Sequence, residues 1–207
     1  MAVWKPCPPP LLEHGGPALF LDRDGVVVVE KDYLRDPESV ELMPGVAETM
    51  RAAAAAGFLI IGVSNQSGLG RGRFSPDDFS AVMSRIDEML AEQGAGFDGF
   101  YFCPHAPQDG CGCRKPATGL LDEAAASCRW DAGRSWVVGD KASDVALGRN
   151  GGMGAVLVRT GYGAEQEGTV ARLWQDDPRV LVAADLPAAF AAILRAAKRN
   201  QGKDPDR

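Results

Sequence analysis

Short apolar runs, each bounded by polar residues, glycine or proline, recur along the 207-residue chain. Such runs between turn signals are typical of buried strands. The predicted strands are Ala18–Leu21, Val26–Val29, Phe58–Val63, Gly99–Phe102, Trp136–Val138, Ala155–Val158 and Val180–Val182.

Apolar residues at helical spacing separate these runs. The clearest predicted helix is Ser75–Gln93, which has an N-cap candidate in Ser75, proline at the next position and Asp78 at the third helical position. The other predicted helices are Pro44–Ala56, Leu120–Cys128, Ser143–Asn150 and Pro187–Arg199.

Strands and helices therefore alternate along the chain. This order predicts an α/β fold, a Rossmann-like parallel sheet with helices on both faces. Residues 1–17, rich in proline and glycine, are predicted to form an irregular arm, and residues 18–207 a single domain. Ligands of such sheets bind beyond the carboxyl ends of the strands, so the polar residues that follow each strand are the candidates for chemistry.

Composition narrows the function classes. The chain is 45% hydrophobic, and 22 basic against 28 acidic residues give a net charge of −6. The acidic balance argues against nucleic acid as a partner. No apolar run approaches the ~20 residues that span a membrane, and the proline-rich start is not a secretory signal. We therefore expect a cytoplasmic protein without a membrane partner.

The first strand runs into Asp22-Arg23-Asp24-Gly25. Two carboxylates two residues apart can share one site, where one attacks an electrophile and the other transfers a proton. A calcium loop fails on the spacing of glycine and glutamate. A simple strand-terminating turn remains the alternative for this tetrapeptide alone.

Three further strand ends carry polar groups. Ser64 begins a Ser-Asn-Gln-Ser-Gly loop whose hydroxyl and backbone amides can hold an oxyanion, although it lacks the Gly-Lys-Ser/Thr of a P-loop. Arg114 and Lys115 suit a phosphate dianion, with plain surface solvation as the alternative. Asp140 sits where it could hold Mg²⁺ together with Asp22, and Asp144 either supports that site or caps the next helix.

The cysteines predict a second metal. Cys103, His105, Cys111 and Cys113 match the ligand count of a tetrahedral Cys₃His zinc site, with free thiols as the alternative. Four protein ligands leave no position for substrate, so this zinc would be structural and would stiffen the loop that carries Arg114 and Lys115. Cys7 and Cys128 have no partner in this scheme, and Cys128 is predicted to be a small core residue.

The four strand-end motifs, in this order, resemble those of the haloacid dehalogenase (HAD) superfamily of phosphatases over residues 18–161. Finer detail resembles the subgroup of D-glycero-D-manno-heptose 1,7-bisphosphate and histidinol-phosphate phosphatases. The segments that carry the likeness are Phe20–Gly25, Ser64–Gly68, Cys103–His105 and Cys111–Pro116.

The resemblance implies roles for these residues. Asp22 would take the phosphoryl group as an aspartyl phosphate, and Asp24 would act as general acid and then general base. The side chains of Asp22 and Asp140 and the backbone carbonyl of Asp24 would hold Mg²⁺. Lys115 and the Ser64 hydroxyl would complete the catalytic set by neutralising phosphate charge.

The substrate-binding residues are predicted from the same likeness and from the loops around the site. They are Glu30, Lys31, Asp32, Tyr33, Asn65, Gln66, Ser67, Arg114 and Lys141. The family's usual glycine before the tyrosine is replaced here by Asp32. The short spacing between motifs leaves no room for a large cap domain, so these loops would select the substrate.

The function implied by the resemblance is removal of the 7-phosphate of D-glycero-D-manno-heptose 1,7-bisphosphate by a monomer that uses Mg²⁺ and structural Zn²⁺. Histidinol-phosphate phosphatase is the close alternative. A nucleic-acid 3′-end phosphatase would share the first two motifs, but the chain lacks a basic stripe. A zinc-dependent binding module would leave the four motifs unexplained.

Overall fold

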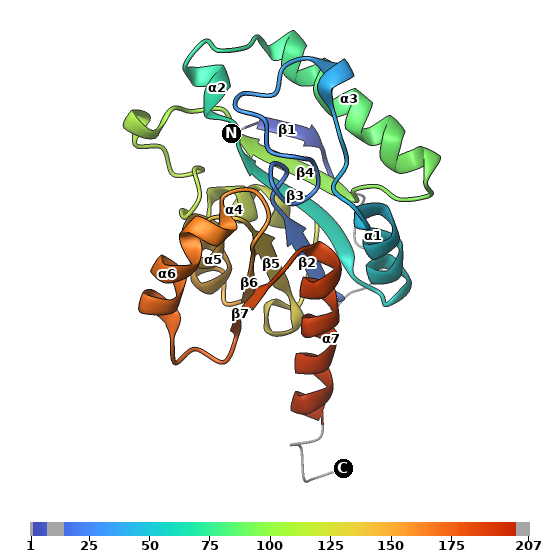
Figure 1. Ribbon diagram of the computed structural model, residues 1–207, viewed down its shortest axis with the longest axis vertical. Coiled ribbons are helices and arrows are strands. Elements are labelled where there is room, and N and C mark those ends of the chain that lie inside the picture. The colour runs from blue at the N-terminus through green and yellow to red at the C-terminus, as the bar shows by residue number, and fades with distance from the viewer. Residues whose placement is uncertain (1, 8–14, 202–207) are drawn as a thin grey trace.

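The computed structural model describes residues 2–7 and 15–201. Seven strands of this part form one sheet in the order β1-β4-β3-β2-β5-β6-β7 (Figure 1). Their bounds are β1 Ala2–Lys5, β2 Ala18–Leu21, β3 Leu59–Asn65, β4 Gly99–Cys103, β5 Trp136–Gly139, β6 Gly154–Val158 and β7 Val180–Ala183. All neighbours are parallel except β1, which pairs antiparallel with β4.

Helices cover both faces of the sheet (Figure 1). Helices α1 (Val46–Ala55), α3 (Pro76–Glu92) and α7 (Leu186–Gln201) pack on one face, and α4 (Gly119–Ala125), α5 (Ala142–Asn150) and α6 (Gly163–Trp174) pack on the other. The remaining elements are short: α2 (Ser67–Gly70), η1 (Pro37–Ser39), η2 (Pro107–Asp109) and η3 (Ala132–Arg134). The predicted α/β fold, a parallel sheet between two helical layers, is confirmed.

The sequence pattern also located the ends of α3. Ser75 accepts a hydrogen bond from the backbone of Asp78, and the Asp78 carboxylate accepts one from the backbone of Ser75, which completes a capping box. The buried residues of this helix lie in the core that includes β2 and β3, and they are Phe79, Val82, Met83, Ile86 and Leu90.

The predicted strand at Val26–Val29 is wrong. Gly25 takes a left-handed conformation (φ 77°), and the backbone amides of Val27 and Val28 both donate to the carbonyl of Arg23. The segment is a tight turn in which Val28 makes only isolated bridges. Val26, Val27 and Val28 are buried as core-filling loop residues. A run of four valines does not by itself distinguish a strand from a buried turn.

The expectation of an irregular arm over residues 1–17 needs correction at its start. Ala2–Lys5 form the edge strand β1, and Cys7 is joined by a disulfide to Cys128, whose Cα lies 5.7 Å away. The prediction that Cys128 is a core residue agrees with its burial, but it also has this partner. Residues 8–14 of the predicted arm lie outside the described part of the chain.

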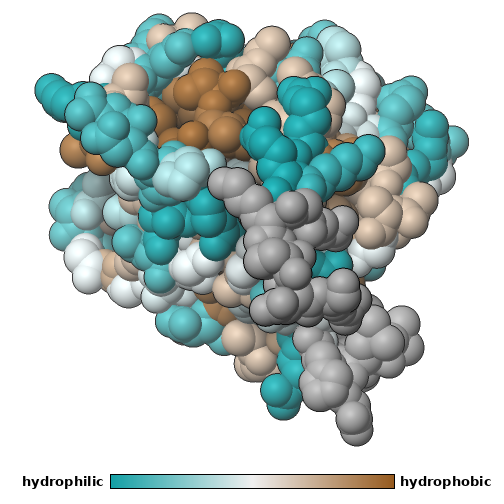
Figure 2. Space-filling model, turned by 90° about the horizontal axis from the view of Figure 1, so that it is seen from below, coloured by the Kyte–Doolittle hydropathy of each residue, from teal (hydrophilic) through white to brown (hydrophobic). Residues whose placement is uncertain are grey.

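The loops that follow the strands contain no second folded layer. Between β2 and α1 the described chain has only η1, and between β3 and α3 only α2, as expected for a chain without a large cap. Figure 2 shows a lower face on which hydrophilic residues surround smaller apolar areas. None of the described helices has the length and apolar character needed to cross a membrane.

Candidate active site

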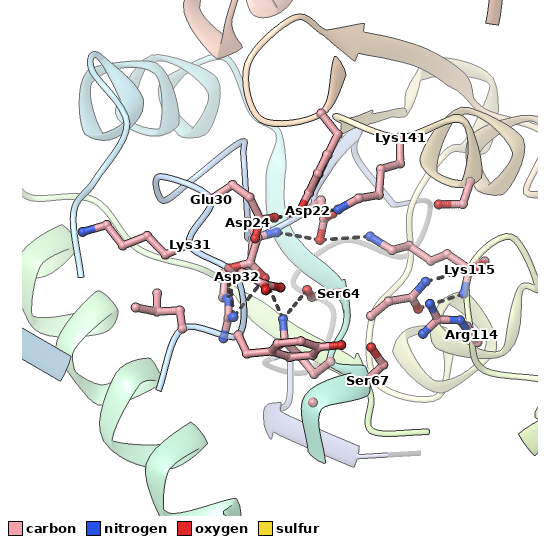
Figure 3. Close-up of a pocket in the computed structure, with 18 of the residues that line it drawn as sticks. Asp22, Asp24, Glu30, Lys31, Asp32, Ser64, Ser67, Arg114, Lys115 and Lys141 are labelled. Carbon is pink, nitrogen blue, oxygen red and sulfur yellow. Dashed lines mark hydrogen bonds and ion pairs between the residues drawn. The ribbon is translucent and has the colours of Figure 1, made fainter. Parts of the chain in front are cut away.

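The carboxyl ends of β2, β3, β4 and β5 meet at one edge of the sheet and surround a pocket of about 330 Å³ (Figure 3). Every residue of the predicted catalytic and substrate-binding sets lines this pocket. Asp140 and the four cysteine-cluster residues are not among the lining residues. Chain segments more than 100 residues apart in sequence are therefore brought to one site.

Asp22 is the first residue beyond the central strand β2. Its backbone amide donates to the carbonyl of Val138 on β5, and its Oδ1 accepts from the amide of Arg23 and lies 3.0 Å from Lys115 Nζ. Burial alone would raise the pKa of Asp22, but the ammonium groups of Lys115 and Lys141 outweigh it, and the pKa lies below its ordinary value. The two ammonium groups therefore favour the ionised carboxylate, which is the form that a nucleophilic role would need.

Lys115 connects three strand ends. Its Nζ contacts Asp22 Oδ1 at 3.0 Å, Asp144 Oδ1 at 2.6 Å and the carbonyl of Val63 at 2.7 Å. Burial would lower the pKa of Lys115, but the carboxylates of Asp144 and Asp22 raise it above its ordinary value. All three ammonium protons are thus directed at fixed acceptors. Asn65 adds to this by holding the backbone of Lys115 through two hydrogen bonds.

The sequence left two roles open for Asp144, support of the site and capping of the next helix. Its carboxylate caps α5 by accepting from the backbone amide of Lys141 at 3.0 Å, and it pairs with Lys115. It thus caps α5 and also contacts Lys115, the partner of Asp22, so its position fits both of the alternatives.

The Gln66 side chain links Asp24 to Ser64 by hydrogen bonds. The Gln66 side-chain amide donates to Asp24 Oδ2 at 2.9 Å and to Ser64 Oγ at 2.8 Å. Gln66 is buried at the pocket wall, where its side chain is hydrogen-bonded to both neighbouring groups. Arg23 approaches the same Asp24 carboxylate from the other side.

Asp140 has the environment of a cation ligand. It is fully buried; Oδ2 accepts from the amide of Tyr162 at 2.9 Å, and Oδ1 has no hydrogen-bond partner among the described residues. Burial raises the pKa of Asp140 to about 7, and the Asp22 carboxylate adds to the rise. Oxygens of Asp22, Asp140 and Asp144 all lie within 4.8 Å of one another. A hard divalent cation would relieve this repulsion, so the donor set fits Mg²⁺.

Two glycines make room for Asp140. Gly25 and Gly161 both have positive φ angles, 77° and 55°, and a Cβ at either position would collide with Asp140 Oδ2. Gly161 follows β6 and had no role in the sequence-based interpretation. A close approach of this kind leaves no signal in a single sequence.

Lys141 approaches Asp22 from above Lys115 in the view of Figure 3. Its Nζ is 3.5 Å from Asp140 Oδ1, 3.8 Å from Glu30 Oε2 and 4.5 Å from the centre of the Tyr162 ring. Burial raises the pKa of Glu30 to about 7, with the Asp24 carboxylate adding to the rise. Tyr162, which also lines the pocket, was not predicted.

The remaining predicted substrate-binding residues differ in whether their side chains are directed toward the pocket. Lys31 Nζ donates to the carbonyl of Ser39, so its charge is directed away from the pocket (Figure 3). Arg114, Ser67 and Asp32 line the mouth. Tyr33 also lies there, with φ 56° and its hydroxyl accepting from Arg71 Nη1 at 3.2 Å.

The four cluster residues converge beside this pocket. His105 Nδ1 lies 3.3 Å from Cys113 Sγ, and Cys111 Sγ lies 3.5 Å from both other sulfurs. A tetrahedron of zinc–sulfur bonds has ligand separations of about 3.8 Å. None of these three cysteines is in a disulfide. The ligand atoms are therefore close to the spacing that zinc requires.

Comparison with known proteins agrees with this geometry. A HAD-hydrolase-like family model matches residues 112–189. The chain is 38% identical over 184 residues to the D-glycero-beta-D-manno-heptose-1,7-bisphosphate 7-phosphatase of Yersinia pestis, covering 85% of this chain and 96% of the relative. The enzyme of the same name from Escherichia coli K12 is also 38% identical, with 84% and 93% covered.

Solved structures agree. The D,D-heptose 1,7-bisphosphate phosphatase of B. bronchiseptica, complexed with magnesium and phosphate, superposes with a TM-score of 0.76 at 31% identity, covering 86% of this chain and 98% of that one. A HAD-like phosphatase from Mesorhizobium loti gives 0.74 at 30% identity, with 94% of each chain covered. The chain thus belongs to the D-glycero-β-D-manno-heptose-1,7-bisphosphate 7-phosphatase family of HAD-like hydrolases.

Proposed function

We propose that this chain is a magnesium-dependent phosphomonoester hydrolase that removes the 7-phosphate of D-glycero-β-D-manno-heptose 1,7-bisphosphate. The observation that carries the proposal is the placement of Asp22. Its carboxylate ends the central strand, has Lys115 Nζ at 3.0 Å, and has a second carboxylate, Asp24, two residues on in the same pocket. The choice of substrate rests on the two relatives at 38% identity, which are both heptose-1,7-bisphosphate 7-phosphatases.

The first step transfers the phosphoryl group to the protein. An oxygen of Asp22 forms a bond to phosphorus while the bond from phosphorus to the sugar oxygen breaks. The electron pair of that bond stays on the sugar oxygen, which takes a proton from Asp24. The Lys115 ammonium and the Ser64 hydroxyl face the charge that develops on the phosphoryl oxygens.

The second step releases phosphate. Asp24, now ionised, takes a proton from water as the water oxygen bonds to phosphorus and the bond to Asp22 breaks. Inorganic phosphate leaves, and Asp22 and Asp24 return to their starting states. Arg23 and Gln66 keep Asp24 within the pocket through both steps.

Two metals complete the proposal. Asp22, Asp140 and the backbone carbonyl of Asp24 would hold magnesium, which would neutralise charge between the nucleophile and the phosphate dianion. Asp144 is occupied by Lys115 and by the α5 backbone, which favours a supporting role. Cys103, His105, Cys111 and Cys113 would hold a structural zinc that fixes the loop carrying Arg114 and Lys115.

Substrate selection is proposed to come from the pocket rim. Arg114 and Lys141 are the cationic side chains that line the pocket without being fully buried or turned away, and they would contact the phosphate that is not cleaved. Glu30, Tyr33 and Ser67 line the wall where the sugar hydroxyls would lie.

The test is phosphate release with Mg²⁺ from the two anomers of the heptose bisphosphate, histidinol phosphate and a 3′-phosphorylated oligonucleotide. We expect kcat/KM for the β-anomer to exceed that for histidinol phosphate and the oligonucleotide by about 100-fold, which corresponds to ~2.8 kcal/mol of transition-state binding. A preference of that size for histidinol phosphate would replace the proposed substrate and retain the mechanism.

A further inference from the structure

Arg23, the residue between the two aspartates of the first motif, is buried. Its side chain is only 2% exposed, and it is one of the largest fully buried side chains of the described chain. Burying a guanidinium is costly unless it is paired, so a buried arginine calls for a specific partner. No step of the proposed mechanism requires a positive charge at this position.

The partner of Arg23 is the Asp24 carboxylate. Arg23 Nε lies 3.0 Å from Asp24 Oδ1, and Arg23 Nη2 lies 2.9 Å from both Oδ1 and Oδ2. Gln66 Nε2 also donates to Asp24 Oδ2, at 2.9 Å. Both oxygens of Asp24 are therefore held by donors from two different strand ends.

Packing holds Arg23 in turn. Its guanidinium carbon lies 5.8 Å from the centre of the Phe79 ring on α3. Phe79 packs against Phe102 of β4 with ring centres 4.2 Å apart, and against Trp4 of β1 at 6.3 Å. Arg23 Nη1 is buried and has no hydrogen-bond partner within the described residues, so Asp24 provides the charge compensation for the group.

We propose that Arg23 and Gln66 form a clamp that fixes the Asp24 carboxylate in the orientation needed for proton transfer, which makes both of them positioning residues. The inference deepens the proposed function, because it rests on Asp24 as the proton-transferring group. A carboxylate gripped at both oxygens cannot rotate about its terminal bond. In a site without a large cap, this clamp supplies from the body of the domain the alignment that proton transfer needs.

The proposal assigns Gln66 a role different from the substrate contact expected from the sequence. Its amide spans the proton-transfer group and the phosphate-facing Ser64 hydroxyl, at 2.9 and 2.8 Å. Arg23 supplies what lysine cannot, because a guanidinium fork grips two carboxylate oxygens while an ammonium is a point charge.

The test uses Arg23→Met and Arg23→Lys in the full chain with magnesium, with p-nitrophenyl phosphate as substrate. p-Nitrophenolate leaves without being protonated, so forming the aspartyl phosphate does not need Asp24, whereas its hydrolysis does. We expect a rapid burst of about one p-nitrophenolate per active site, followed by steady turnover about 100-fold below wild type. Arg23→Lys should restore little of the steady rate.

The control variant is Arg85→Gln on α3, whose side chain is 39% exposed and pairs only with Glu88. It should match wild type in burst and steady rate. If Arg23→Met does not fold, Gln66→Met carries the test, because it removes one of the grips on Asp24 and should give the same burst with about a 10-fold lower steady rate.

Two outcomes would overturn the clamp: steady turnover of the folded variants within about threefold of wild type, or equal loss of burst amplitude and steady rate, which marks a purely structural role. The test does not depend on the natural substrate. If the wild-type enzyme does not hydrolyse the heptose bisphosphate while the Arg23 variants show the burst with p-nitrophenyl phosphate, the proposed substrate is refuted and the clamp is supported.

Discussion

The carboxylates at the strand ends share one residue type but have different neighbours. Asp22 is surrounded by two ammonium groups, which lower its pKa against the effect of burial. Asp140 is also buried but lies against the Asp22 carboxylate, and burial raises its pKa to about 7. The first arrangement suits a nucleophile and the second suits a cation ligand, so two predictions belong to single residues.

Asp22→Asn should reduce phosphate release to below about 0.1% of wild type, because an amide cannot become an aspartyl phosphate. The size of the side chain is kept, so far-UV circular dichroism should be unchanged. Phosphate release is measured with a coupled assay on the heptose bisphosphate. A rate of phosphate release above about 10% of the wild-type rate would exclude covalent catalysis at this residue.

Relative to wild type, Asp140→Asn should have opposite effects on thermal stability in the absence and in the presence of Mg²⁺. The raised pKa means that the native chain binds a proton at Asp140 more tightly than the unfolded chain, so stability falls as pH rises from 3.8 to about 7. The side-chain amide of Asp140→Asn does not ionise, so the variant does not lose this stability as the pH rises. In magnesium-free buffer at about pH 8, the variant should unfold about 4 °C above wild type.

Added Mg²⁺ should raise the unfolding temperature of wild type and leave that of Asp140→Asn unchanged, because only wild type keeps the ligand. Differential scanning calorimetry measures both. Asp176→Asn, an exposed change after α6, is the matched control and should follow wild type throughout. Equal Mg²⁺ stabilisation of Asp140→Asn and wild type would place the cation elsewhere.

At the scale of elements, the loop from β4 to α4 has little regular structure. Its only regular element is η2, and it ends in Arg114 and Lys115. Cys103 closes β4, while Cys111 and Cys113 immediately precede the two cations. A metal bound by these residues would tie the loop to the sheet edge.

Purified protein should therefore contain about one zinc per chain by elemental analysis. Cys111→Ser should lose the zinc and lower the apparent affinity for substrate, because Arg114 is no longer held at the pocket mouth. The secondary structure should persist, since Cys103, at the end of β4, is the one cluster residue that belongs to the described sheet. Zinc-free wild-type protein with unchanged KM would contradict this assignment.

At the scale of the whole molecule, the β1 edge of the sheet is held by contacts between remote parts of the chain. The Cys7–Cys128 disulfide joins positions 121 residues apart and links the chain after β1 to the chain after α4. Trp4 Nε1 also donates to Asp87 on α3 at 2.9 Å. The first residues of the chain thus cover the β4 edge.

Replacing both Cys7 and Cys128 by alanine should lower the free energy of unfolding by about 2–4 kcal/mol, since the cross-link restrains the unfolded chain. Urea unfolding measures the change. Thiol titration of denatured, zinc-free wild type should find three of the five cysteines before reduction and all five afterwards. Five thiols before reduction would show that the bond is absent.

The sequence by itself determined the order of strands and helices, the capping box of α3 and the four strand-end motifs. These features are local: they depend on apolar periodicity, on caps and on residues next to a strand end, which a single chain displays directly. The convergence of Asp22, Ser64, Lys115 and Asp140 followed from one global rule, that parallel strands bring their carboxyl ends together.

Only the tertiary structure decided the contacts that no local pattern encodes. Val26–Val29 became a buried turn, Ala2–Lys5 joined the sheet as its edge strand, and Gln66 turned toward Asp24 and Ser64. The Cys7–Cys128 bond and the approach of Gly161 to Asp140 join positions far apart in sequence. Such contacts depend on which surfaces the folded layers bring together, and the free energy of that packing belongs to the whole molecule.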